Sequence, residues 1–382
     1  MTTVQNSIGI VNEQTGFVEL STTVHGHHLP RTVQVPINDP YVMAKAVAAW
    51  KAKSESLLLV FEGEELIKYN AHRNSFFEKK VDFPEDLWVV NVIFFSKGWL
   101  SFSGNKNISS ETFDLLKRFG AVFEQTYTRF NDLKQVEEQA RESQIEVSLE
   151  RVRATSMAMH RSQDLNEVIK VVCEQLVHLG LKFDGTNFIK VMEDGSWQMW
   201  TINPAQKYPS LIYMPYKDIH SINILNATLE KDEEQIAVLF SKAEKDEFFQ
   251  YFFSNTVARM TPEDRKAYVL NGSGWSLTIF VVKNIVLNIF NYDTIPFSDS
   301  DNAIVRRFAK VFEQSYIRFL DLQKAEAQAR EAQIEAALEK VRSRTLAMQK
   351  SDELAETAAV MFKQLIHLGI EPNRLYIILF KD

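Results

Sequence analysis

Residues 118–180 read RFGAVFEQTYTRFNDLKQVEEQARESQIEVSLERVRATSMAMHRSQDLNEVIKVVCEQLVHLG, and residues 307–369 read RFAKVFEQSYIRFLDLQKAEAQAREAQIEAALEKVRSRTLAMQKSDELAETAAVMFKQLIHLG. The two stretches align without a gap at a constant spacing of 189 residues, and about half of their positions are identical. Self-similarity over a long period is typical of a chain built from repeated structural units. We therefore predict a duplicated unit of about 190 residues.

The segment before each copy predicts a β-hairpin. Residues 88–103 read WVVNVIFFSKGWLSFS, and residues 275–292 read WSLTIFVVKNIVLNIFNY. Each is an apolar run of β-branched and aromatic residues that a two-residue turn interrupts, Lys97-Gly98 in the first and Lys283-Asn284 in the second. Gly and Asn tolerate the positive φ angles that tight hairpin turns require.

Other strand-like runs lie at the front of each unit. Residues 8–23 and 187–203 each predict two strands around a polar turn that ends in Gly. A short strand that a Pro stops follows in each unit, over 33–40 and 212–219.

Helical stretches fill the middle of each unit. Apolar residues at helical spacing predict a helix over 40–52, and a second helix of the first unit is predicted over 63–77. The second unit has a longer helical segment at 222–240, and a further helical segment at 242–253 follows it. Hairpins make an antiparallel sheet and helices cover it, so the predicted fold class is α+β.

Residues 113–160 and 302–349 predict two very long helices. They lack Pro and are rich in Ala, Glu, Gln, Arg and Leu, which are strong helix formers. A helix of about 45 residues is about 65–70 Å long, and no small domain buries such a rod along its whole length. We expect a coiled coil with the same helix of a second copy; a surface helix packed on its own domain is the alternative.

Apolar residues at spacings of three and four on these helices predict the seam of a parallel homodimer. The predicted seam residues are Phe123, Phe130, Leu133, Ile145, Leu149, Val152, Phe312, Phe319, Leu322, Ile334, Leu338 and Val341. Leu133 and Ile145 are 12 residues apart, as are Leu322 and Ile334. Since this gap is not a multiple of seven, the heptad phase slips there, which suits a signalling helix that rotates or slides.

A new helix is predicted after each long one. Ser162 and Ser351 precede acidic residues and are predicted N-caps of helices over 163–178 and 352–367, each of which ends in His-Leu-Gly. EPNRLYIILFKD at 371–382 then resembles the first strand of a third unit. A strand without a partner leaves its backbone unsatisfied, so we expect the chain to be a fragment of a longer protein.

These features divide the chain into five parts. They are a first domain without its leading helix at 1–112, a long helix at 113–161, a second domain at 162–301, a second long helix at 302–350, and the start of a truncated third unit at 351–382.

The stretch VFEQSYIRFLDLQKAEAQAREAQIEAALEKVRSRTLAMQKSDEL at 311–354 resembles the connecting helix of a family of bacterial sensor proteins. In this family, GAF-like domains occur in tandem ahead of an effector, which is often a histidine kinase and sometimes a nucleotide cyclase or a phosphatase. The order of strands and helices in each unit is also similar to that of a GAF domain. The resemblance implies two GAF-like domains joined by long coiled-coil-type helices, with a role in sensing or dimeric signal relay and no chemistry in these units.

The composition argues against several other classes of protein. A formal net charge of −7 makes general nucleic-acid binding a poor fit. The lone Cys173 excludes an internal disulfide and a Cys-cluster zinc site. No apolar run reaches the roughly 20 residues that span a bilayer, and the N-terminus does not resemble a secretory signal. We expect a soluble, cytoplasmic protein with no membrane segment.

Aromatic residues are the candidates for a small-molecule pocket, although aromatics at strand spacing more often pack in a core. In the second unit they are Trp197, Trp200, Tyr213, Tyr216 and Trp275, and in the first unit they are Trp50, Phe94 and Trp99. The longer middle segment at 222–262 favours the second unit as the ligand binder. The sequence leaves the identity of the ligand, and of any cofactor, open.

Histidine and cysteine offer weaker candidates. His25, His27 and His28 form a cluster that we interpret as an exposed loop rather than a metal site. Cys173 corresponds to Phe362 in the second copy, so we expect it in the core rather than attached to a chromophore. We predict no metal site and no catalytic residue in this chain.

Three hypotheses about function remain. The first is a non-catalytic sensory or relay module, homodimeric through its long helices, that acts on a downstream effector domain in cis. The second is a fragment of a histidine kinase or nucleotide cyclase whose catalytic domain lies beyond Asp382. The third is a ligand-free dimerisation scaffold with filled cores.

Overall fold

A computed structural model describes residues 5–24, 27–28, 32–75, 86–228, 234–282, 285–370 and 374. The chain divides into two compact units, Met1–Gln139 and Ala140–Asp382. The boundary lies inside α3 (Ser110–Met157), one of the two long helices.

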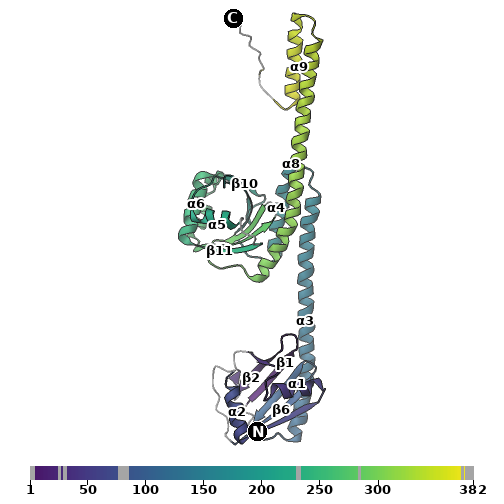
Figure 1. The fold of residues 1–382 in the computed structure, drawn as a ribbon, viewed down its shortest axis with the longest axis vertical. Helices are drawn as coiled ribbons and strands as arrows, with labels where there is room; N and C mark the ends of the chain where they lie inside the picture. Colours follow the sequence, from purple (N-terminus) through teal and green to yellow (C-terminus); the bar gives the residue numbers. More distant parts are fainter. Residues whose placement is uncertain are drawn as a thin grey trace. The chain divides into compact units, whose positions relative to one another are not determined.

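The first unit is built on an antiparallel sheet with the order β3-β2-β1-β7-β6-β5, and β4 pairs with β2 (Figure 1). Its strands are β1 (Gln5–Asn12), β2 (Phe17–Val24), β3 (His27–His28), β4 (Val33–Pro36), β5 (Ser56–Glu62), β6 (Leu87–Phe95) and β7 (Gly98–Gly104). Helices α1 (Met43–Lys51) and α2 (Gly63–Arg73) pack on one face, where residues such as Val47 and Leu66 join the core of the sheet. The first half of α3 covers the other face, since Phe123 contacts the ring of Phe95.

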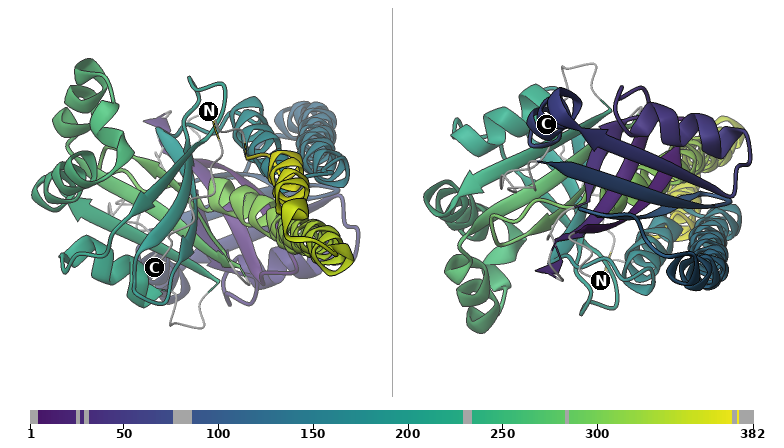
Figure 2. Two further views of the ribbon diagram at one scale, coloured as in Figure 1. Left: turned by 90° about the horizontal axis from the view of Figure 1, so that it is seen from above. Right: turned by 90° about the horizontal axis from the view of Figure 1, so that it is seen from below.

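The second unit repeats this plan (Figure 2). Its sheet has the order β10-β9-β8-β13-β12-β11, so β9-β8-β13-β12-β11 matches β2-β1-β7-β6-β5. The strands are β8 (Gly185–Val191), β9 (Trp197–Ile202), β10 (Ser210–Met214), β11 (Gln235–Ser241), β12 (Gly274–Val282) and β13 (Ile285–Asn291). The helices are α4 (Leu165–His178), α5 (His220–Thr228), α6 (Lys242–Asn255), α7 (Glu263–Asn271), α8 (Asp299–Ala347) and α9 (Leu354–His367), with short 3₁₀ turns at Ser162–Asp164, Val257–Met260 and Ser351–Glu353.

The sheet of the second unit separates two cores. Successive strand residues point to opposite faces, so neighbours such as Phe188 and Ile189 belong to different cores. One core lies between the sheet and α5, α6 and α7. The other lies between the sheet and a layer made by the end of α3, α4 and the first half of α8.

Five of the predicted seam residues lie in this second core. Ile145, Leu149, Val152, Phe312 and Phe319 are buried against one another and against the sheet. They are therefore not available to a partner helix, and their assignment to an interchain seam is wrong for this structure. The physical reason is that helical spacing marks a buried face without saying whether the covering surface belongs to the same chain.

The other seam residues are less covered. Phe123, Leu322, Ile334 and Val341 are half-buried, whereas Phe130, Leu133 and Leu338 are exposed. The second half of α8 packs against α9, which runs antiparallel to it (Figure 1). The carbonyl of Leu368, just after α9, accepts a hydrogen bond from Arg330 of α8 at 2.6 Å. The dimer seam as a whole stays a prediction.

The phase slip in each long helix has a simple structural meaning. In α3 it falls at residues 134–144, which are exposed and include the boundary between the two units. Before the slip, α3 packs on the sheet of the first unit; after it, α3 packs in the core of the second unit. The change of phase is thus where the helix changes the surface on which it packs.

Several local predictions need correction. Ser162 does not cap the helix that follows; Asp164 accepts hydrogen bonds from the backbone N–H groups of His160 and Arg161, both at 2.9 Å, and this lowers the pKa of its carboxyl group. Gly98 is the first residue of β7 rather than a turn residue, because the turn is formed by residues 96–97. A Cβ at Gly98 would lie 1.9 Å from the carbonyl oxygen of Gly9, so the close approach of β1 requires glycine.

The predicted helix over 222–240 is wrong in its second part. Residues 220–228 are helical, but Gln235–Ser241 form the edge strand β11, which pairs with β12. The turn at residues 283–284 and the strand expected at 371–382 lie outside the described residues, apart from Arg374. The C-caps are confirmed: Gly180 and Gly369 follow α4 and α9 with φ angles of +81° and +83°.

We expect Leu149→Ala to lower the free energy of unfolding of the full chain by about 2–5 kcal/mol, because it opens a cavity in a packed core. The measurement is urea unfolding. Val147→Ala is the matched control on the same helix, since its side chain is exposed, and it should change the value by less than about 0.5 kcal/mol. Equal effects of the two substitutions would contradict the placement of Leu149 in the core.

Candidate functional site

A cavity of about 290 Å³ lies between the second sheet and helices α6 and α7. Its walls are largely aromatic and aliphatic, which suits a small organic ligand. The apolar lining includes Trp197, Met199, Ile212, Phe248, Phe249, Phe252, Phe253, Trp275 and Phe290. The corresponding space in the first unit is about 50 Å³ and is lined by Trp99 among others.

Three polar groups lie in the floor of this cavity. Asn187 on β8 and Asn288 on β13 are directly opposite each other in the antiparallel pair, and both are more than nine-tenths buried. Their Oδ1 atoms and the indole N–H of Trp275 have no hydrogen-bond partner among the described residues. Buried polar atoms are nearly always paired, so these three are open positions for a ligand or for ordered water.

The lining also contains a cation and an acid. The guanidinium carbon of Arg265 lies 4.7 Å from the ring centre of Tyr268 and 6.0 Å from that of Tyr292, within range of cation–π attraction. Asp184 accepts hydrogen bonds from the Tyr268 hydroxyl (2.5 Å) and from the Tyr292 backbone N–H (2.8 Å). The hydrogen bond to Asp184 raises the pKa of Tyr268. No ion pair of Arg265 is found in the described part of the chain.

The structure places only some of the predicted ligand-binding residues at the cavity. Trp197 and Trp275 line the cavity. Trp200 is one residue out of phase on β9, so it lies on the opposite face, against Tyr316 and Phe319 of α8. Tyr213 and Tyr216 are exposed and are not among the lining residues.

The pattern of aromatic residues in the sequence does not predict Asn187 or Asn288 as site residues. A polar residue in the middle of each apolar strand is a visible signal, since buried strands rarely tolerate one without a use. The strand register that pairs the two amides is not visible in the sequence.

The other candidates have structural roles or lie outside the described residues. The Trp50 indole N–H donates to the Phe95 carbonyl at 3.0 Å, and Phe94 and Trp99 meet edge to face in the first unit. His25 and the side chains of His27 and His28 are not among the residues that the structure describes. In the described residues, no group of three or more His, Cys, Asp or Glu side chains is placed to hold a metal ion. None of the described helices combines the length and the apolar character needed to cross a membrane.

The cavity is linked to α8 through the sheet. Asn187 and Asn288 face the cavity, and their chain neighbours Phe188 and Leu287 face the opposite core. The ring centres of Phe188 and Phe312 are 4.2 Å apart. On β8, a residue that lines the cavity is therefore next to one that packs directly against α8.

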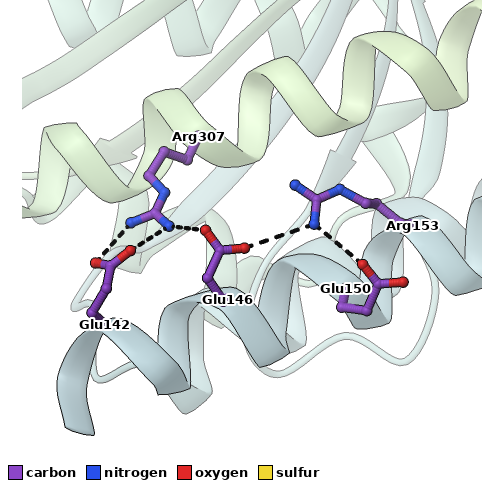
Figure 3. A network of polar contacts seen from close by, with 5 residues as sticks. All are labelled: Glu142, Glu146, Glu150, Arg153 and Arg307. Atoms are coloured by element: carbon purple, nitrogen blue, oxygen red, sulfur yellow. Dashed lines mark hydrogen bonds and ion pairs between the residues drawn. The ribbon is translucent and has the colours of Figure 1, made fainter. Parts of the chain in front are cut away.

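A polar network joins the end of α3 to the start of α8 (Figure 3). Arg307 donates two hydrogen bonds to Glu142, at 2.7 and 3.0 Å, and one to Glu146 at 2.5 Å. Arg153 forms ion pairs with Glu146 at 3.8 Å and with Glu150 at 3.2 Å. The hydrogen bond from Arg307 lowers the pKa of Glu142.

Two more polar contacts join α8 to the residues just after α3, further toward the C-terminus in both segments. Arg318 of α8 donates to the carbonyl of Met159, just after α3, at 2.8 Å. Glu326 accepts from the backbone N–H and the hydroxyl of Ser162, at 2.9 and 2.6 Å. From the Arg307–Glu142 contact to the Glu326–Ser162 contact, the residue numbers rise in both segments, so α8 runs parallel to the end of α3.

No family model matches this sequence, and no curated protein matches it. Solved structures similar to the chain include the GAF domain of an Acinetobacter phosphoenolpyruvate-protein phosphotransferase, at 12% identity over 47% of this chain and 93% of that one, with a TM-score of 0.30. The phycoerythrobilin-bound GAF domain of a cyanobacterial phytochrome aligns at 14% identity over 47% of this chain and 95% of that one, with a TM-score of 0.29.

A third similar structure is a bacteriophytochrome from the photosynthetic bacterium R. palustris. It aligns at 12% identity over 96% of this chain and 67% of that one, with a TM-score of 0.33. Similarities at TM-scores this low carry no argument about the role of the chain.

Loss of the Arg307 cation should destabilise the chain in a pH-dependent way. The folded-state pKa of Glu142 is lowered, so its stabilisation is present above the unfolded pKa and is lost as the pH falls through the folded pKa. We expect Arg307→Met to cost up to about 1 kcal/mol at pH 7 and to converge with wild type toward about pH 3 in urea unfolding. Arg342→Met, which removes ion pairs within α8 only, is the control; an equal pH dependence in both variants would contradict the role of Arg307.

Cys173 should be unreactive in the folded protein. Burial raises the pKa of its thiol to about 12, so the thiolate that reacts is scarce at pH 8. We expect labelling by iodoacetamide to be at least about tenfold slower in native protein than in urea, measured by intact mass. A native rate close to the unfolded rate would show that the thiol is accessible.

Proposed function

We propose that this chain is a non-catalytic sensory and relay module with two GAF-like units, which acts in the cytoplasm of a bacterium. The second unit binds a small molecule in its cavity, and binding shifts the strands that form the floor of the cavity. This shift passes through the sheet to α8 and on to an effector domain in the same protein. The observation that carries this proposal is the set of unpartnered polar atoms, on Asn187, Asn288 and Trp275, in the floor of an aromatic cavity.

The energetics of these atoms favour a ligand. A buried polar atom without a partner costs about 1–3 kcal/mol, and ordered water recovers part of that cost. A ligand that donates to the asparagine oxygens and accepts from the indole N–H recovers it while also burying apolar surface. The chemistry of the lining therefore suits a flat, largely apolar heterocycle with a donor and an acceptor on its edge.

The alternation of residues along the strands supports the proposed relay. A ligand shifts the equilibrium toward the arrangement of β8 and β13 that it binds best. The same strands carry Phe188 and Leu287 on the other face, in contact with the core that holds Phe308 and Phe312 of α8. The proposed output is a change in the position of α8, which is a single helix from Asp299 to Ala347.

The scaffold hypothesis is less well supported. A scaffold with filled cores needs no cavity, yet the second unit has one of about 290 Å³ with open polar positions. The five buried seam residues are not available to a homodimer, so self-association of the chain requires other residues.

We expect at least one planar heterocycle to raise the thermal midpoint of the full chain by about 2 °C or more. The measurement is a thermal-shift screen with purines, pterins, flavins and indoles as probes. Asn288→Leu should weaken binding of the hit about tenfold or more, because it removes a hydrogen-bond acceptor from the floor.

Gln198→Leu is the matched control, an amide on the same sheet that does not line the cavity. It should bind the hit as wild type does. A hit that binds wild type and Asn288→Leu equally would contradict the proposed site, and a screen without any hit would contradict the ligand class.

A further inference from the structure

The first half of α3 carries an apolar face that is uncovered among the described residues. We call it the α3 face; its residues are Phe119, Val122, Phe130 and Leu133, which are 61, 60, 57 and 45% exposed. Soluble proteins rarely leave a row of large apolar side chains in water without a partner.

The same face exists in the second copy of the repeat, where it is covered. At the spacing of 189 residues, Phe119, Val122 and Phe130 correspond to Phe308, Val311 and Phe319. These are identical residue types, and they are 0, 6 and 7% exposed. What differs between the copies is therefore the neighbouring structure and not the side chains.

The cover in the second unit is the hairpin made by the end of α3 and α4. Ile145, Leu149, Val152 and Leu165 of this hairpin lie in the same core as Phe308 and the rest of the covered face of α8. In the first unit, no such hairpin is present among the described residues.

The chain carries a second copy of this hairpin, formed by the end of α8 and by α9. We call its apolar side the hairpin face, and its exposed members are Leu338, Leu354 and Ile370, at 44, 48 and 45%. Their counterparts in the first hairpin are, in the same order, Leu149, Leu165 and Leu181, at 1, 1 and 5%. The chain thus has one uncovered face of each kind in its described part.

We call the contact between the first hairpin and α8 in the second unit the covered joint. The charged residues that form ion pairs across this joint are repeated at the two uncovered faces. In the covered joint, Arg307 binds Glu142 and Glu146. The residue at the position of Arg307 is Arg118, and those at the positions of the two acids are Glu331 and Glu335.

The other two polar contacts of the joint are repeated as well. Arg129 stands at the position of Arg318, and Glu137 stands at that of Glu326. Ser351 stands at the position of Ser162. No ion pair of Arg118, Arg129, Glu137 or Glu331 is found in the part of the chain that the structure describes.

We propose that the α3 face binds the hairpin face of a second copy of this chain, with Arg118 pairing to Glu331 and Glu335. The two faces differ in kind and lie at separate places in the sequence, so the contact is head-to-tail and each bound copy leaves one face of each kind open. Wild-type chain should therefore form a series of oligomers whose average mass rises with concentration.

The test uses two variants of the full chain. Phe119→Asp with Phe130→Asp removes the α3 face, and Leu338→Asp with Leu354→Asp removes the hairpin face. Each variant alone should remain at 44.1 kDa by analytical ultracentrifugation at concentrations where wild type assembles. An equimolar mixture should form a 1:1 dimer at twice that mass and nothing larger, since only one pair of intact faces remains.

Charge exchange then tests the register. In the variant that keeps its α3 face, Arg118→Glu should weaken the mixed dimer about tenfold or more. Glu331→Lys with Glu335→Lys in the other variant should restore it, because the pairing is then reversed in sign.

The controls are exposed apolar residues of the same helices that lie outside both faces. Val147→Asp and Leu346→Asp should assemble as wild type does. Unchanged circular dichroism and thermal midpoints show that each variant is folded, as expected for substitutions at exposed positions. A wild type that stays at 44.1 kDa up to about 200 μM, or a mixture that forms no dimer, would overturn the proposal.

Discussion

Phe312 has no exposed surface because it is held between the second sheet and the hairpin formed by α3 and α4. The sheet alone covers one side of this side chain, and the hairpin covers the other. A sheet of this kind has two apolar faces, and each must be buried by helices. The short helices α5, α6 and α7 cover one face of the second sheet. The other face is covered by a long helix that follows the sheet in sequence and by a hairpin that precedes it. This requirement for a cover from both sides explains why α3 extends from the first unit into the second.

The candidate site depends on the same sheet. Its floor is made by two neighbouring strands, and the reverse side of those strands is the surface on which α8 lies. Few residues are needed to connect the two sides, because adjacent residues of one strand already face both ways. The residues of the second core are almost fully buried, and a close-packed interior has little free space in which to absorb a displacement, which supports the proposed relay.

The repeat in the sequence predicts much of the fold. The duplication, most of the strands, both long helices and the glycine C-caps at 180 and 369 correspond to what the structure shows. The errors have physical causes. Ile145 and Phe312 fit an interchain seam because periodicity identifies a buried face but not its partner. The segment that forms β11 fits a helix because its continuous apolar run, IAVLF at 236–240, lacks the alternation that identifies a half-buried strand. Asn187 and Asn288 escape notice because a cross-strand pair is defined by register, which a single strand does not reveal.

The position of the boundary between the two units has a consequence for how repeat proteins of this kind lengthen during evolution. It lies inside a helix and in the out-of-phase stretch, so the second unit contains a sheet together with the hairpin that precedes and covers that sheet. A gene duplication with the 189-residue period of the repeat adds a new sheet and its cover in one event, and the added unit continues the long helix that leaves the unit before it. The length of the protein can then change in whole units during evolution without any new interface having to arise by point mutation.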